Sequence, residues 1–132
     1  MSQENVEIVK QSIEAFARRD IKTMRTLNDA DLEVDWSRSA GVQAGIYRGF
    51  EAVLRFYEGF YEVFEMDIIE PDRFIDTGEF VAVPNTARLR GRDGIELSAR
   101  STLVFELRDS KIIRICLYQR TDEALKAVGL EE

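Results

Sequence analysis

The stretch IELSARSTLVFEL, residues 95–107, places its side chains on two different faces in strict alternation. A period of two is typical of a β-strand that packs one face on a core, so the stretch predicts a long strand. The other face is largely polar, with Val104 as its apolar exception. We expect the face that points inward to carry Ile95, Leu97, Ala99, Ser101, Leu103, Phe105 and Leu107.

The segments on either side of this stretch repeat its pattern. FVAVPNTARLR (80–90) precedes it across the turn GRDG, and KIIRICLYQR (111–120) follows it after RDS. Both predict strands that are joined to 95–107 as hairpins. On 80–90 the more apolar face has one polar member, Asn85, and we expect it to point inward with Val81, Val83, Ala87 and Leu89.

The last strand can face either way, because the length of its turn sets the register. A two-residue turn would place Arg114, Cys116 and Tyr118 inside. We favour a three-residue turn, because it buries no arginine. That turn would instead place inside Ile113, Ile115, Leu117 and Gln119.

The N-terminal half is dominated by helical periodicity. Helices are predicted over 3–18, over a short segment capped by Asp20, and over 50–64, with a strand at 32–36 between them. A strand follows at 66–75, where Pro71 suggests an edge or a bulge, and a short helix begins at Thr121. Helices followed by hairpins predict an α+β fold: one domain over 1–132, with helices on one face of a curved antiparallel sheet.

Composition excludes several classes of function. The net charge is −7 and the basic residues form no cluster, which argues against nucleic acid and membrane partners. The chain has one cysteine, Cys116, and no histidine, so we expect no disulfide scaffold, metal site or cofactor. General acid–base work would fall to Asp, Glu, Tyr, Lys, Cys or water. No signal peptide or membrane span is evident, which predicts a cytoplasmic protein.

Five segments in this order resemble the SnoaL-like domain family of the nuclear transport factor 2-like, or ketosteroid isomerase-like, superfamily. They are ENVEIVKQSIEAFARRD (4–20), LEVDW (32–36), GIYRGFEAV (45–53), FIDTGEFVAV (74–83) and FELRDSKIIRICLYQRTDEALKAVGL (105–130). The resemblance implies a cone-shaped, cystatin-like α+β barrel. Three helices of the N-terminal half would pack in its curved sheet around an apolar cup, with a short C-terminal helix.

The resemblance also says where catalytic groups would lie. In the steroid isomerase branch, the positions of the base, the acid and the tyrosine fall on Trp36, Leu103 and Ser12, so those groups are absent. A dehydratase would need a cup histidine, and an epoxide hydrolase an inward Asp–Arg pair, and we find neither. Asp35 is one residue from Trp36, and alternation makes it a solvated outer residue.

The resulting expectation is a cup for a small hydrophobic molecule of polyketide or terpenoid type. Asn85, Tyr57 and Asp35 are the weak catalytic candidates. Asn85 could donate to a ligand carbonyl or bond to the backbone at a bulge at Pro84, and Arg48 beside Tyr47 could clamp a ligand at the rim. The expected lining is Trp36, Tyr47, Tyr57, Tyr61, Val83, Asn85, Ser101, Leu103, Phe105, Ile115, Leu117 and Gln119.

Two other functions remain open. One is a cofactor-independent polyketide cyclase, isomerase or epoxide-hydrolase-type enzyme that uses Asp35 or another acid, and an inward carboxylate would favour it. The other is a non-catalytic dimer whose cup is filled by its own side chains. A homodimer is expected in any case, because the resemblance implies pairing of sheets and the outer face carries Thr102, Val104, Cys116 and Tyr118.

Overall fold

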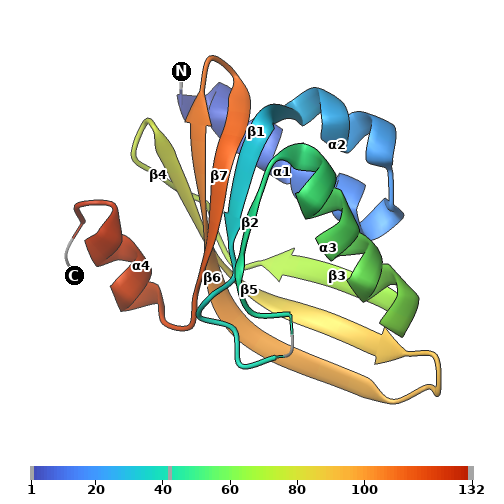
Figure 1. The fold of residues 1–132 in the computed structure, drawn as a ribbon. Coiled ribbons are helices and arrows are strands. Elements are labelled where there is room, and N and C mark those ends of the chain that lie inside the picture. Colours follow the sequence, from blue (N-terminus) through green and yellow to red (C-terminus); the bar gives the residue numbers. More distant parts are fainter. Residues whose placement is uncertain (1, 42, 131–132) are drawn as a thin grey trace.

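The computed structural model describes residues 2–41 and 43–130. Its helices are α1 (Ser2–Arg18), α2 (Ile21–Leu27), α3 (Phe50–Val63) and α4 (Thr121–Ala127). Its strands are β1 (Asn28–Asp35), β2 (Ile46–Arg48), β3 (Phe64–Pro71), β4 (Ile75–Asp76), β5 (Phe80–Gly91), β6 (Glu96–Arg108) and β7 (Lys111–Tyr118). The strands form a curved sheet in the order β2-β1-β7-β6-β5-β3, with β4 beside β5, and α1 and α3 pack in its hollow (Figure 1).

The predicted α+β cone is confirmed, and so are the signals that begin its helices. The Asp20 carboxylate accepts a hydrogen bond from the backbone N–H of Thr23 at 3.1 Å, which caps α2. Gly49, with a φ of 89°, begins α3, and Gly129, with a φ of 87°, follows α4. Both backbones lie in the left-handed region that glycine adopts without a steric penalty.

The sheet differs from the predicted one in two places. β1 pairs with β7 in parallel, so the sheet is mixed rather than wholly antiparallel. β2 lies inside the segment that we expected to be a loop, and it pairs with β1 from Glu33↔Arg48 to Asp35↔Ile46. A parallel neighbour is possible there because α3 and five further strands separate β1 from β7 in the chain.

The turn before β7 has two residues, Asp109 and Ser110, both with positive φ, rather than the three that we preferred. Such a turn matches the twist of a hairpin. The register between β6 and β7 then shifts by one residue at a bulge. Leu107 pairs with Ile112, whereas Glu106 pairs with Arg114. The bulge restores the expected facing from Ile115 onward, so that Arg114 stays outside. Ile112, fully buried, takes the inner position that we had given to Ile113.

Pro71 marks the edge strand correctly, but Pro84 makes no bulge. Pro71 ends β3, which is the outermost strand of the sheet, and the predicted strand 66–75 stops there. β5 and β6 stay in register through Pro84↔Thr102 and Asn85↔Ser101. The bulge that we considered at Pro84 is therefore wrong.

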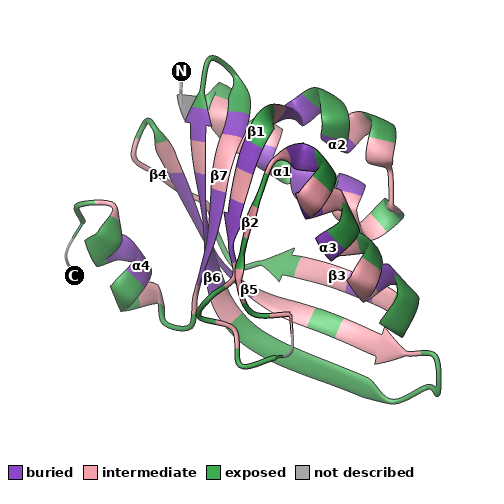
Figure 2. Cartoon of the chain, viewed as in Figure 1, coloured by how far each residue is buried: buried purple, intermediate pink, exposed green. Residues whose placement is uncertain are grey.

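The C-terminal helix covers part of the outer sheet face. Ala124 and Leu125 of α4 pack against Val104 of β6, and the hydroxyls of Thr121 and Thr102 lie 2.7 Å apart. Figure 2 shows the buried positions on α4 that result. Three of the four residues on which we based the homodimer, Thr102, Val104 and Cys116, are buried within one chain.

Within the described residues, no helix is both long enough and apolar enough to cross a membrane.

Candidate functional site

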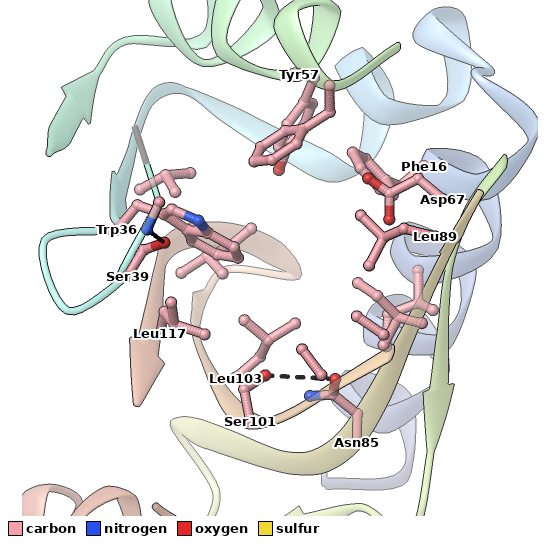
Figure 3. A pocket seen from close by; sticks show the side chains of 18 of the residues that line it. Phe16, Trp36, Ser39, Tyr57, Asp67, Asn85, Leu89, Ser101, Leu103 and Leu117 are labelled. Carbon is pink, nitrogen blue, oxygen red and sulfur yellow. Dashed lines mark hydrogen bonds between the residues drawn. The ribbon is translucent and has the colours of Figure 1, made fainter. Parts of the chain in front are cut away.

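A cavity of about 360 Å³ lies between α1, α3 and the concave face of the sheet. Its size is within the range of ligand pockets, roughly 300–1,000 Å³, so the cup is not filled by its own side chains. Figure 3 shows its open centre and the residues around it. Of the expected lining, the residues that border it are Trp36, Tyr57, Asn85, Ser101, Leu103, Phe105, Ile115, Leu117 and Gln119.

Three expected residues lie behind the wall instead. The Tyr47 hydroxyl donates to the backbone oxygen of Gln43 at 2.6 Å. The Tyr61 hydroxyl donates to the backbone oxygen of Phe16 at 2.8 Å. Val83 is fully buried in the core. The structure therefore gives these residues a packing role, and none of them borders the cavity.

Arg48 is not the rim clamp that we considered. Its guanidinium donates to the carboxylate of Glu33 at 3.1 Å, and that carboxylate also accepts from Arg114 on the outer face. The cation is therefore paired away from the cavity, whose lining does not include it.

Aromatic side chains make much of the wall. The Trp36 ring meets those of Phe56 and Phe60 edge to face, with centroids 5.5 and 6.4 Å apart. Phe16 and Tyr57 meet in the same way at 5.0 Å. Because edge-to-face pairs hold each ring at a fixed angle, the cluster gives the cavity a defined apolar shape.

Asp67 of β3 is the cavity residue that the sequence did not predict. It is 9% exposed and borders the cavity beside Phe16 and Leu89, as Figure 3 shows. No residue that the structure describes donates a hydrogen bond to its carboxylate. Burial raises the pKa of Asp67 to about 6, although the positive charge of Arg19 opposes the rise. A carboxyl group with such a pKa can accept and return a proton near neutral pH.

Arg19 does not neutralise Asp67 by direct contact. Its guanidinium donates to the backbone oxygens of Tyr61 and Phe64, at 3.2 and 2.7 Å, where α3 ends and β3 begins. It also lies over the Tyr61 ring, 4.6 Å from the centroid. The cation is held by these groups, so the carboxylate of Asp67 stays available to a ligand.

Tyr57, Asn85 and Ser101 are among the other polar residues that border the cavity. Tyr57 enters it from α3, and its hydroxyl has no hydrogen-bond partner in the described part of the chain. Burial raises the pKa of Tyr57, which keeps the hydroxyl protonated. Asn85 donates to the backbone oxygen of Val83 at 2.9 Å and accepts from the Ser101 hydroxyl at 3.4 Å. Asn85 thus makes the bond to the backbone that we considered, although without a bulge at Pro84.

Asp35 faces outward, as expected, but it is buried rather than solvated, with 6% of its surface exposed. Arg114 and Arg38 approach its carboxylate at 3.2 and 3.5 Å, and the Ser37 hydroxyl donates to it at 2.6 Å. Burial alone would raise the pKa of Asp35, but the bonds from Ser37 and the two cations lower it. Asp35 is therefore a structural ion-pair residue outside the cavity.

Asp35→Asn should destabilise the protein by ~1–3 kcal/mol at pH 7, because it leaves the charges of Arg38 and Arg114 without their partner. A lowered pKa in the folded state stabilises the protein above about pH 4, and this contribution is lost as the pH falls below that value. The gap between wild type and variant should therefore shrink in acid. Urea unfolding from pH 3 to 8 measures it, and a gap that widens in acid would contradict this account.

Comparison with known proteins agrees with the fold. The SnoaL-like domain profile matches residues 9–115. Bal32a, from a soil-derived mobile gene cassette, is 19% identical, with 89% of each chain covered and a TM-score of 0.80. An NTF2-like protein of Burkholderia xenovorans is 26% identical, with 89% of this chain and 90% of that chain covered and a TM-score of 0.75.

A third structure is similar over nearly the whole chain. TerC, co-crystallised with polyporic acid, is 21% identical, with 93% of this chain and 96% of that chain covered and a TM-score of 0.77. No curated protein sequence matches the chain. Because the profile spans most of the chain and the element order agrees, the protein belongs to the SnoaL-like domain family.

Proposed function

We propose that the protein binds a small, mostly apolar carbonyl compound in the cavity and moves a proton on it, as in a cyclisation or isomerisation. The observation that carries this proposal is Asp67, a buried carboxylate that accepts no hydrogen bond from the described residues and borders an otherwise largely apolar cavity. An inward carboxylate is the feature that we expected to favour an enzyme over a simple binder. Asp67, and not Asp35, takes the role of the acid.

The proposed step needs two groups of this chain and no cofactor. The Asp67 carboxylate accepts a proton from the carbon next to the carbonyl. The electron pair of that C–H bond forms a carbon–carbon double bond, and the π pair of the carbonyl moves to its oxygen to give an enolate. The Tyr57 hydroxyl donates a hydrogen bond to the oxygen where negative charge develops. Protonated Asp67 then returns the proton to the same carbon or to a conjugated one, which regenerates the carboxylate.

The apolar wall favours this chemistry. A buried carboxylate beside Phe16 and Leu89 is poorly hydrated, so its basicity is higher than in water. The protonated phenol of Tyr57 can donate but cannot compete as a base. TerC, with its bound polyporic acid, is a neighbour of the same fold with an organic ligand, which supports a ligand of this general kind.

The test is deuterium exchange at the activated carbon of 2-tetralone in D2O, followed by NMR. We expect the wild type to accelerate exchange over buffer, with a rate that rises as the pH passes about 6, where Asp67 becomes the carboxylate. Asp67→Asn should lower the protein-catalysed rate by ~100-fold or more, the scale for loss of a general base. A variant that keeps the wild-type rate would place the base elsewhere.

Binding is measured separately, through the fluorescence of Trp36, the only tryptophan. Because Trp36 borders the cavity, 2-tetralone should change its emission saturably in both wild type and Asp67→Asn. Asp31→Asn is the matched control, since Asp31 is exposed on β1 and remote from the cavity lining. It should leave both binding and exchange unchanged.

A further inference from the structure

Two apolar residues that we expected in the cup lie outside it. Leu97 and Ile95 continue the inward face of β6, but they are 56% and 61% exposed, and neither borders the cavity. Figure 1 shows the β5–β6 hairpin projecting from the body of the molecule, and Figure 2 shows its β6 side exposed. We call Leu97 and Ile95 the exit strip.

The exit strip continues the floor of the cavity. Ala99 borders the cavity, and Leu97 is the next residue on the same face of β6. Leu97 also pairs with Leu89, which borders the cavity from β5. In the described part of the chain, β7 pairs with β6 only from Thr102 to Arg108, so residues 96–101 form a free edge of the sheet at this end of the cavity.

The apolar character is confined to one face of the hairpin. On the other face, Arg90 pairs with Glu65 at 2.7 Å and with Glu96 at 3.6 Å. A molecule that leaves the cavity along β6 therefore meets leucine and isoleucine on the concave side and ion pairs on the convex side. Asp67 pairs with Leu89, and Leu89 pairs with Leu97, so the three residues lie side by side across β3, β5 and β6. Two inter-strand spacings place Leu97 about 10 Å from Asp67.

We propose that the exit strip binds the apolar chain of an elongated ligand whose carbonyl end lies at Asp67. This inference rests on the proposed function and specifies its substrate class: a carbonyl compound with an unbranched apolar chain long enough to reach from Asp67 across Leu89 to Leu97. A second copy of the protein is a poorer occupant, because a stable interface buries about 800 Å² per partner and the strip offers only a narrow line of two side chains.

The test uses methyl ketones of increasing chain length, 2-heptanone, 2-nonanone, 2-undecanone and 2-tridecanone, with binding followed by Trp36 fluorescence. Each methylene that reaches the strip should raise affinity by about two- to four-fold. Leu97→Ser should weaken 2-tridecanone by about ten-fold and leave 2-heptanone unchanged. Leu130→Ser, an exposed leucine beyond α4 on the outer side, is the matched control and should follow the wild type.

The outcomes separate this inference from the proposed function. If 2-heptanone binds but longer chains gain nothing, or if Leu97→Ser keeps the wild-type dependence on chain length, the exit strip is not a subsite and the proposed function stands. If Leu97→Ser instead changes only the sedimentation mass, the strip is a self-association surface and the inference fails. If no ketone binds and no exchange occurs, both proposals fail.

Discussion

Asp67→Asn should make the protein more stable at pH 7.5. The unfolded carboxyl has a pKa near 3.9 and burial raises it to about 6, so the folded state holds its proton more tightly. Stability from this group is fully present below about pH 4 and is lost as the pH rises through 6. The difference of about two pKa units corresponds to a loss of at most ~3 kcal/mol of unfolding free energy when Asp67 ionises in the wild type. The neutral amide of Asn does not ionise, so the variant does not have this loss.

Urea unfolding of wild type and Asp67→Asn from pH 4 to 8 measures this effect. The two proteins should have similar unfolding free energies near pH 4. The difference in favour of the variant should grow up to about pH 7 and then stay constant. Asp31→Asn, at an exposed site, should follow the wild type throughout. A difference that does not change with pH would mean that the Asp67 carboxylate is compensated in the folded state. A catalytic group that costs stability is the usual signature of an active site.

Phe56→Ala should cost ~3–5 kcal/mol of unfolding free energy, the range for removing a buried phenylalanine. Phe56 is 4% exposed, and its ring stacks on that of Tyr47 at 4.3 Å and meets that of Phe60 at 5.0 Å. Phe56 therefore packs α3 against Tyr47 of β2. The lost ring also opens the wall beside Trp36, so the Trp36 emission should move to longer wavelength.

Val63→Ala is the control for this variant. Val63 ends the same helix but is mostly exposed, so the change should stay within ~0.5 kcal/mol. Chemical denaturation followed by circular dichroism compares the two without relying on Trp36. A cost for Phe56→Ala as small as that for Val63→Ala would mean that the aromatic cluster does not hold the cavity wall.

Local pattern was sufficient for most of the elements. The alternation over residues 95–107 predicts β6 within one residue at each end, and Asp20 begins α2 as expected. These features depend on neighbours in the chain: side chains two apart share a face of a strand, and a cap contacts a backbone N–H three residues on. The family resemblance then supplied the curved sheet around the helices, since several segments in order specify a topology that no single segment does.

Which face of a strand points into the cavity, by contrast, depended on contacts between distant parts of the chain. In MDII, residues 66–69, each face of the strand has an apolar member, and Asp67 shares its face with Ile69. Hydrophobicity would turn Asp67 outward, because Met66 and Ile68 make the other face more apolar. Both Asp67 and Ile69 nevertheless border the cavity, where β3 packs near α1. Tertiary packing, and not local pattern, decided which face of β3 is inside.

The two aspartates show the same limit most clearly. The sequence predicted correctly that Asp35 faces outward and Trp36 borders the cup, because alternation is a local property. It could not predict that Asp35 would be buried, since Arg114 lies 79 residues away in the chain. Nor could it predict that Asp67 would border an apolar cavity with no hydrogen-bond donor among the residues that the structure describes. The sequence by itself determined most of the strands and helices, although not β2. The tertiary structure determined which charges are paired and which are free, because burial and pairing depend on residues that meet only when the sheet curves around α1 and α3.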